Sequence, residues 1–420
     1  MEILSTGEKI KRARVYKGIT LKELCSDEIS ISKMSCIENG KIKADSEVLK
    51  YISKKIDIDY NYLVQDVYEQ IEENLNLLRN NKVPLNKIDE FINYNLEYAM
   101  DYSYLDLAFE LIHRLFIFYV ENNKIENIQL LISQYYDLYQ KSSSDKNTLI
   151  YYNDMASFFM KMKEYNEAIN YFSKIREVIE ENGIRDKKEY VYTCFREGLC
   201  YKETNEIQEG YNKLMNAVKY IDYIEDNKDK GKIYQEFANL NILLNKVEAD
   251  RYINLARRYQ GNDLVEVANS KAENGKYYFA IMDNVKAINE IKESIDIFPK
   301  ENEREYVKFL IKCICTLYYN NELDLAVSIC DTALNLAIRF NDLHLIERAY
   351  YFKGMLLQKN NKYREAEMYM NLSTDFLCRF ANKEERYKRY LEMADLYYNL
   401  NEPKECIKYF TLYMNLEKKL

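Results

Sequence analysis

Apolar residues recur every three or four positions along nearly the whole chain, which is the spacing that gathers them on one face of an α-helix. Over residues 1–65 the periodic runs are short and are separated by Gly, Ser, Thr and Asp, so five short helices are expected there. Over residues 66–420 the runs are longer and follow one another in pairs. With 3 prolines and 10 glycines in 420 residues, little interrupts these helices, and the pattern predicts an all-α protein.

Capping residues mark where several of the short helices begin and end. Thr20 and Glu23 form a Thr-x-x-Glu capping box, and the hydroxyl of Ser30 can accept a hydrogen bond from a free amide in the first turn of a third helix. Gly18 and Gly40 stand where a helix commonly closes in the left-handed conformation. Further helices are expected to begin near residue 7, at Asp45 and at Asp59.

The helix that Ser30 begins carries the candidate chemistry of this N-terminal head. Met34 and Ile37 lie three positions apart, so they share one face and are expected to point into a core. Among the side chains left on the outer faces, Lys33 is the one strong hydrogen-bond donor. A lysine there can reach guanine O6 and N7 in the major groove of DNA, and the alternative is an ordinary solvated lysine.

Residues 7–14, 17–24 and 35–41 resemble the Xre/Cro-type helix-turn-helix, a five-helix DNA-binding module. The turn at residues 27–30 departs from the usual Leu-Gly-Val and reads Asp-Glu-Ile-Ser. This variant is similar to the short-turn version found in peptide-pheromone receptors. The resemblance covers nearly all of residues 5–64, and residues 1–65 are therefore expected to form a DNA-binding domain.

The resemblance also implies roles for individual residues of the head. Arg14 and Glu38 are expected to pair inside the domain and to be structural. Duplex DNA carrying an operator sequence is the implied partner, with four residues facing base edges and two lysines facing phosphates. These DNA-binding candidates are Ser32, Lys33, Ser35 and Cys36 for the bases, and Lys41 and Lys43 for the phosphates.

A frame of small and large residues repeats along the body, residues 66–420. A small residue such as Ala156 is followed three positions later by a large one such as Phe159, and a second small–large pair lies on the next helix. The copies are about 40 residues apart, against about 34 in the tetratricopeptide repeat, which this frame resembles. The resemblance implies a right-handed superhelical solenoid of eight or nine helical pairs with a concave inner face. Four glycines are expected where helices approach closely, namely Gly198, Gly210, Gly275 and Gly354.

The first helix of each pair is expected to line the concave face of the solenoid. Asn and Gln amides on that face can bond the backbone of an extended peptide in both directions, and cationic side chains can hold a carboxylate. A short linear peptide is therefore the expected ligand, although each residue taken alone also fits an ordinary solvated groove. The peptide-binding candidates are Asn153, Asp154, Arg196, Gln235, Asn239, Glu273, Lys276 and Lys312.

Charge is distributed unevenly between the head and the body. Residues 1–65 carry a net charge of +2, whereas residues 66–420 carry −10, which together make the net charge of −8 of the whole chain. A mildly basic head on an acidic body suits a protein whose head alone approaches phosphates.

Candidate catalytic and metal-ligating residues are sparse. His113 and His344 lie far apart, so each is expected to be a surface or packed helix residue rather than a base or a ligand. The 9 cysteines never fall in a Cys-x-x-Cys pair, which favours reduced thiols in a cytoplasm. No apolar run reaches the length of about 18 residues that indicates a membrane span, and the N-terminus lacks the order of a signal peptide. We therefore expect no metal or other cofactor, no membrane contact and no enzymatic activity.

The combination of head and body resembles the peptide-pheromone receptors grouped as RRNPP, and most of all the NprR and PlcR kind. The resemblance implies a cytoplasmic, homodimeric quorum-sensing transcription regulator that is controlled by a short signalling peptide in the concave groove. An alternative of a different class is a Rap-like or NprR-like regulator that sequesters a response regulator or promotes its dephosphorylation. A third interpretation is a scaffold that binds whole proteins. The intact head favours DNA binding over both alternatives.

Overall fold

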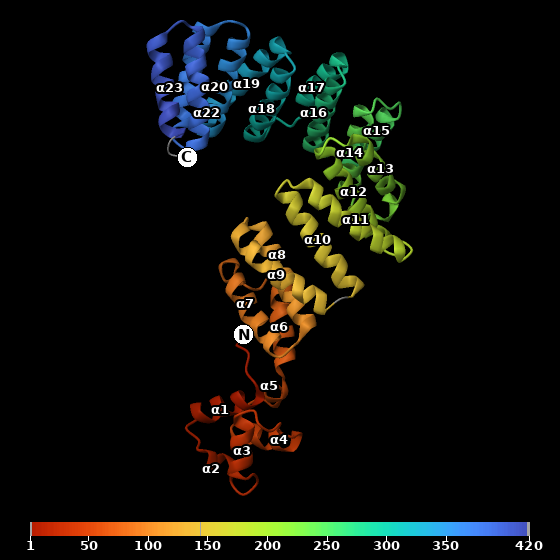
Figure 1. Ribbon diagram of the computed structural model, residues 1–420, viewed down its shortest axis with the longest axis vertical. Coiled ribbons are helices and arrows are strands. Elements are labelled where there is room, and N and C mark those ends of the chain that lie inside the picture. The colour runs from red at the N-terminus through yellow and green to blue at the C-terminus, as the bar shows by residue number, and fades with distance from the viewer. Residues whose placement is uncertain (1, 143, 418–420) are drawn as a thin grey trace. The chain divides into compact units, whose positions relative to one another are not determined.

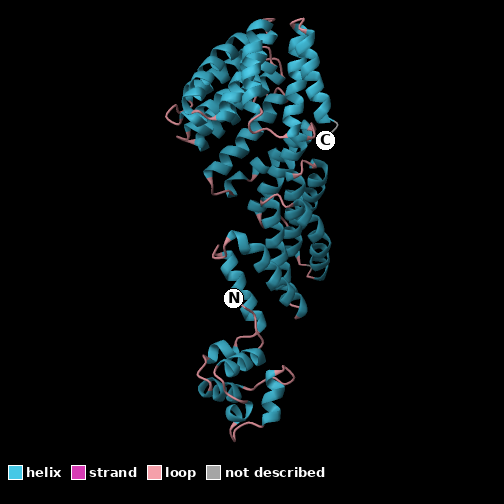
Figure 2. Ribbon diagram, turned by 90° about the vertical axis from the view of Figure 1, so that its left-hand side faces the viewer, coloured by secondary structure: helices cyan, strands magenta, loops and turns pink. Residues whose placement is uncertain are grey.

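The computed structural model describes residues 2–142 and 144–417. Over these residues Figure 2 shows helices and connecting loops and no strand, which confirms the all-α prediction. The chain divides into two compact units, Met1–Asp186 and Lys187–Leu420. In the part of the chain that the structure describes, no helix has both the length and the apolar character needed to cross a membrane.

Five short helices form the N-terminal head of the first unit, at the red end of the chain in Figure 1. Thr20 and Glu23 make the predicted capping box, and Ser30 caps the third helix. Gly18 and Gly40 have the predicted left-handed backbone, with φ of 67° and 69°. The helices are α1 (Thr6–Tyr16), α2 (Leu21–Cys25), α3 (Ile31–Glu38), α4 (Ser46–Lys55) and α5 (Tyr60–Val64), and Asp45 and Asp59 cap the last two as predicted.

The buried faces of these helices meet in one small core. Met34 and Ile37 of α3 are 0% and 2% exposed, which confirms the predicted inward face. The start of α1 lies close to the predicted position, but the sequence analysis missed its capping box, in which the side chains of Ser5 and Glu8 each accept from the other's backbone amide. The other members of this core are Ile10, Leu24, Cys25, Ile29, Leu49, Ile52, Ile56 and Leu63.

The rest of the first unit consists of three helix pairs around an aromatic and aliphatic core. Phe116 and Tyr135 lie at its centre, with ring centroids 5.5 Å apart. The helices are α6 (Val67–Arg79) and α7 (Ile88–Asp101, preceded by the 3-10 turn Leu85–Lys87), α8 (Leu105–Glu121) and α9 (Ile125–Lys141), and α10 (Asp145–Lys161) and α11 (Tyr165–Glu181).

The second unit continues the same plan with six further pairs, which makes nine over the described residues. We call the first helix of each pair its A helix. Within each unit, successive A helices pack against one another. These are α6, α8 and α10 in the first unit, and α12, α14, α16, α18 and α20 in the second. The pairs are α12 (Lys187–Glu203) and α13 (Ile207–Lys219), α14 (Asn227–Leu243) and α15 (Ala249–Gln260), α16 (Leu264–Ala280) and α17 (Asn284–Ile297), α18 (Glu303–Tyr319) and α19 (Leu323–Phe340), α20 (Leu343–Lys359) and α21 (Tyr363–Leu377), and α22 (Lys383–Asn399) and α23 (Pro403–Glu417).

Glycines let the two helices of a pair approach closely, as predicted. A Cβ added to Gly210 would lie 3.0 Å from the carbonyl oxygen of Gly198, and one added to Gly198 would lie 1.9 Å from Leu214 Cδ1. Gly275 and Gly354 are equally crowded by the helix that follows them. None of these four glycines has a positive φ, so their role is steric rather than conformational.

A residue with left-handed backbone conformation lies in the turn between the two helices of each pair. The sequence analysis did not use this signal. Asparagine tolerates positive φ better than other side chains, because its short amide can bond the nearby backbone. Lys163 and Met282 take the position in two of the nine described pairs. In the other seven the residue is Asn81, Asn123, Asn205, Asn245, Asn321, Asn361 or Asn401.

Candidate functional site

Helix α3 is held against α1 by an ion pair with little access to solvent. Arg14 donates from Nε to Glu38 Oε1 at 2.6 Å and from Nη2 to Glu38 Oε2 at 2.9 Å. Its Nη1 donates to the carbonyl oxygen of Ile19 at 2.9 Å. The side chains of Arg14 and Glu38 are 13% and 4% exposed, and the hydrogen bond to Glu38 raises the pKa of Arg14. The predicted pairing is confirmed, and it fixes α3 relative to α1.

Gly7 is a second requirement of this contact, and the sequence analysis did not identify it. A Cβ at this position would lie 2.3 Å from the carbonyl oxygen of Ile37 and 2.9 Å from that of Glu38. Only a glycine therefore lets the first turn of α1 rest on the last turn of α3. The glycine stands in the head motif, but the spacing of residues along the chain does not show which atoms would clash with a larger side chain.

The outer face of α3 and the loop after it expose the candidate DNA-binding residues. Ser32 is exposed and Lys33, Ser35 and Cys36 are half-buried, whereas Lys41 and Lys43 of the loop are exposed. Within α3 the one carboxylate is that of Glu38, which is buried. The structure thus brings these six residues onto α3 and its following loop.

One further feature of this surface, an ion pair of Lys33, was missed by the sequence analysis. Lys33 Nζ lies 3.4 Å from Asp45 Oδ2, and Asp45 also caps α4 by accepting from the amide of Val48. Ile31 and Ile42 are 49% and 46% exposed, so α3 and its loop also present apolar side chains.

The predicted peptide-binding amides of the second unit are buried and bond to one another. Gln235 Nε2 donates to Asn239 Oδ1 at 2.9 Å and to Asn274 Oδ1 of α16 at 2.7 Å. Asn239 Nδ2 donates in turn to Glu236 Oε2 at 3.3 Å. Since Gln235 and Asn239 are 6% and 0% exposed, their amides serve the packing of α14 on α16. Asn274 was not singled out from the sequence.

A lysine that the sequence analysis did not select joins this network. Lys202 Nζ of α12 lies 2.7 Å from Glu236 Oε2 of α14, with the two side chains 14% and 22% exposed. Burial opposes the charged form of Lys202, but the attraction of Glu236 outweighs it and raises the pKa of the lysine. The neighbouring A helices α12 and α14 are therefore linked by charge as well as by packing.

The predicted cations of the A helices are more open to solvent. Arg196 of α12 is half-buried, and Lys276 of α16 and Lys312 of α18 are exposed. Lys312 Nζ lies 3.6 Å from Glu273 Oε1, across two A helices. These residues share the A-helix layer of the second unit.

Asn153 and Asp154 lie on α10 of the first unit. Asp154 is buried, and its Oδ2 accepts from the hydroxyl of Tyr135 at 2.6 Å and lies 2.7 Å from His113 Nδ1. Its carboxylate thus ties α10 to α8 and α9, and His113 is a packed helix residue. Asn153 is half-buried. His344, the other histidine, packs on the ring of Phe380, with centroids 3.9 Å apart.

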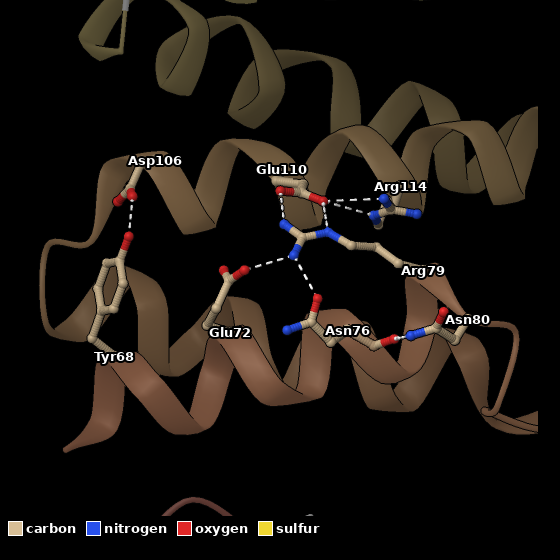
Figure 3. Close-up of polar contacts among 8 residues, drawn as sticks. All are labelled: Tyr68, Glu72, Asn76, Arg79, Asn80, Asp106, Glu110 and Arg114. Carbon is tan, nitrogen blue, oxygen red and sulfur yellow. Dashed lines mark hydrogen bonds and ion pairs between the residues drawn. The ribbon is translucent and has the colours of Figure 1, made fainter. Parts of the chain in front are cut away.

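The A helices of the first unit enclose a cavity of about 550 Å³ that the sequence analysis did not foresee. Figure 3 shows Arg79 of α6 reaching Glu110 of α8, with hydrogen bonds of 2.9 and 2.5 Å. Burial opposes the charged form of Glu110, but Arg79 and Arg114 outweigh it and lower the pKa of the carboxyl. The lining is Tyr68, Glu72, Arg79, Asp106, Leu107, Phe109, Glu110, His113, Arg114, Lys146, Asn147 and Ile150.

This lining carries paired charges of both signs. Arg79 also donates to Glu72 at 2.6 Å, and the hydroxyl of Tyr68 donates to Asp106 at 2.5 Å. That hydrogen bond raises the pKa of Tyr68 to about 12. Across the described residues, no group of three or more His, Cys, Asp or Glu side chains is arranged to hold a metal ion.

Comparison with known proteins gives structural similarities only. No family model matches the chain, and no curated protein matches it. Among solved structures, the chain is similar to PlcR from Bacillus thuringiensis in complex with the peptide PapR7 and DNA, with 16% identity, a TM-score of 0.35, and coverage of 64% of this chain and 98% of that one. It is also similar to the apo form of the quorum sensor NprR from B. thuringiensis, with 14% identity, a TM-score of 0.45, and coverage of 84% and 98%. A Rap protein complexed with competence and sporulation factor gives 15% identity, a TM-score of 0.44, and coverage of 83% and 96%. The fold class of this chain is therefore established by its own helix pairs, described above.

Proposed function

We propose that the chain is a transcription regulator of the Xre type, in which residues 1–65 bind duplex DNA through α3. The observation that carries this proposal is the asymmetry of α3. One face is held on α1 by the Arg14–Glu38 pair, and the other presents Lys33, which has the exposed carboxylate of Asp45 as a neighbour at 3.4 Å. A helix held in place in this way, with a lysine on its outer face, suits insertion into the major groove, and Lys41 and Lys43 of the following loop are proposed to contact phosphates.

The test is a gel-shift assay with genomic fragments, followed by titration of the selected site at several salt concentrations. Lys33→Ala is expected to lose about 1–3 kcal/mol of preference for the selected site, because it removes a base contact. Lys41→Ala is expected to weaken all sequences alike and to lower the salt slope by about 1, because it removes a phosphate contact. The exposed Lys228 of α14 supplies the control, Lys228→Ala. Absence of any sequence preference at every salt concentration would refute the proposal.

The proposal includes control of DNA binding by a short linear peptide on the A helices of a right-handed solenoid. Arg196, Lys276 and Lys312 support it, since they offer positive charge on α12, α16 and α18 within a body of net charge −10. A free peptide C-terminus is the simplest anion for them to meet, and an arginine can hold it with two hydrogen bonds. Gln235 and Asn239 are expected to support this surface through α14 and α16 rather than to bond the peptide.

Calorimetry with peptides that co-purify with the protein tests this second part. Arg196→Ala is expected to weaken peptide binding at least tenfold, about 1.4 kcal/mol, while leaving DNA affinity without peptide intact. The exposed Arg258 of α15 provides the matched control, Arg258→Ala. Equal affinity of wild type and Arg196→Ala removes Arg196 from the site. If no short peptide binds and the receiver domain of a response regulator binds instead, the chain belongs to the Rap-like class of regulators.

The regulator is proposed to act in the cytoplasm as a homodimer. Dimeric helix-turn-helix proteins bind two half-sites about one helical turn apart, so the selected DNA is expected to be close to palindromic. Sedimentation of the full chain at micromolar concentration gives the oligomeric state directly. A monomer bound to a single asymmetric site contradicts this part of the proposal.

A further inference from the structure

The first residues of the chain pack on the body rather than in the core of the head. Ile3 is 0% exposed and belongs to the same core cluster as Ile71 of α6 and Leu96 of α7. Leu4 is 8% exposed. Burial of these two apolar side chains removes them from water and so holds this short segment in place. We call residues 2–5 the N-terminal strap.

Side chains of the body hold the backbone of this strap. The amide of Leu4 donates to Gln70 Oε1 at 3.0 Å, and Gln70 Nε2 donates back to the carbonyl oxygen of Leu4 at 2.9 Å. The amide of Ile3 donates to the hydroxyl of Tyr94 at 2.9 Å. Gln70 is 7% exposed, and its side-chain amide satisfies both the N–H and the C=O of Leu4, as the backbone of a neighbouring strand would. Losing it would leave buried polar groups unpaired.

A buried lysine holds α1 to the end of the head, next to the connection to α6. Lys9 of α1 is 1% exposed, and its Nζ donates to the carbonyl oxygens of Tyr62 at 2.7 Å and Gln65 at 2.8 Å. Burial lowers the pKa of this lysine, although the carboxylates of Glu69, Glu73 and Asp66 on the α6 side oppose that shift. The lysine therefore bonds the end of α5 at the point where the chain leaves the head.

The covalent connection itself is short. Helix α5 ends at Val64, and Asp66 caps α6 through a capping box with Glu69. Gln65 is the one residue between α5 and that cap, so the connection has none of the length that makes a linker flexible. The strap and the connection therefore join the head to the body at two separate points, and Lys9 fixes α1 beside the second of them.

We infer that Gln70 and Tyr94 are positioning residues that fix the head, α1–α5, on the first helix pair of the body, α6 and α7, and that Lys9 supports them by holding α1 to the end of α5 where the chain enters α6. The head and this pair then rotate as one body, and a displacement of α6 moves α3 with it. The consequence for DNA binding rests on the proposed function, whereas the rigid attachment stands on the contacts alone. Coupling between distant sites needs such a physical connection, and here the N-terminal strap supplies it.

Nuclear magnetic resonance relaxation of amides in the full chain, labelled with nitrogen-15 and deuterium, tests the attachment without DNA. In the wild type, amides of α1 and α3 are expected to share the slow rotational correlation time of those in α6 and α7. Gln70→Leu and Lys9→Met, combined, are expected to shorten the correlation time of the head alone. Gln134→Leu, the same change at an exposed position of α9, is the matched control and is expected to change nothing.

Two outcomes overturn the inference: a head that tumbles independently in the wild type, or one that keeps the slow correlation time in the combined variant. Should that variant disturb the fold of α6, Tyr94→Phe, which removes the hydroxyl that accepts from the amide of Ile3, is measured in its place with the same expectation. A gel-shift assay on the same proteins separates the two proposals. If the wild type binds no DNA, the proposed function fails, while the relaxation data still decide the attachment.

Discussion

Replacing Glu38 by Gln tests how much the contact between α1 and α3 contributes to the head. The substitution keeps the shape of the side chain but removes the charge that faces Arg14 at 2.6 and 2.9 Å. Arg14 is 13% exposed, and after the substitution it has only neutral acceptors, the amide oxygen of the new side chain and the carbonyl oxygen of Ile19. A buried ion pair broken on one side costs about 3–5 kcal/mol, because the remaining charge is left uncompensated. Whole domains are stable by about 5–15 kcal/mol, so the head is expected to open locally.

Hydrogen exchange of the amides in α1 and α3 measures this loss, because local opening is resolved there even when the rest of the chain stays folded. Exchange in α3 is expected to speed up by a factor of at least 100, which corresponds to about 2.7 kcal/mol. The double variant Arg14→Met, Glu38→Leu is the control, since replacing both partners by apolar residues of similar size is often nearly neutral. The reasoning is refuted if Glu38→Gln changes exchange less than fivefold, or if the double variant is as unstable as the single one.

Gly7→Ala is expected to destabilise the head by about 1–3 kcal/mol and to weaken DNA binding, because the added methyl meets the carbonyl oxygen of Ile37; an unchanged melting curve argues against the close contact. Gly210→Leu is expected to lower the melting temperature of the second unit, since an added Cβ would lie 3.0 Å from the carbonyl oxygen of Gly198; a circular-dichroism melting curve equal to that of the wild type contradicts it. Glu110→Gln is expected to cost about 1 kcal/mol near neutral pH through its partly exposed pair with Arg79. Since the folded pKa of Glu110 is lowered, this stabilisation is lost as the pH falls below about 4, and the difference from wild type in urea melts should vanish there.

Local features of the fold were predictable because their causes lie within a few residues of each other. The capping box of Thr20 and Glu23 and the left-handed Gly40 depend on neighbours no more than a turn away. The crowded Gly198 and Gly210 were predictable from the repeat, since each copy places the same helix contact at the same spacing. The pairing of Arg14 with Glu38 followed from the resemblance of the head rather than from spacing.

The orientation of polar side chains in the A helices was decided only by the tertiary structure. Asn153 and Gln235 occupy equivalent positions of the repeat, yet the first is half-buried and the second is buried against Asn274, 39 residues away. Asp154 turns toward Tyr135 and His113 for the same reason, because helices distant in sequence supply its partners.

The sequence by itself therefore determined where helices begin, end and approach one another, because backbone hydrogen bonds and side-chain size act locally. Only the tertiary structure decided which polar groups stay open to a ligand and how the head is attached. The strap shows this most clearly: nothing near Ile3 in the sequence indicates that Tyr94, 91 residues later, accepts a hydrogen bond from its amide. Burial of a polar group requires a partner, and the partner's position along the chain is set by packing rather than by periodicity.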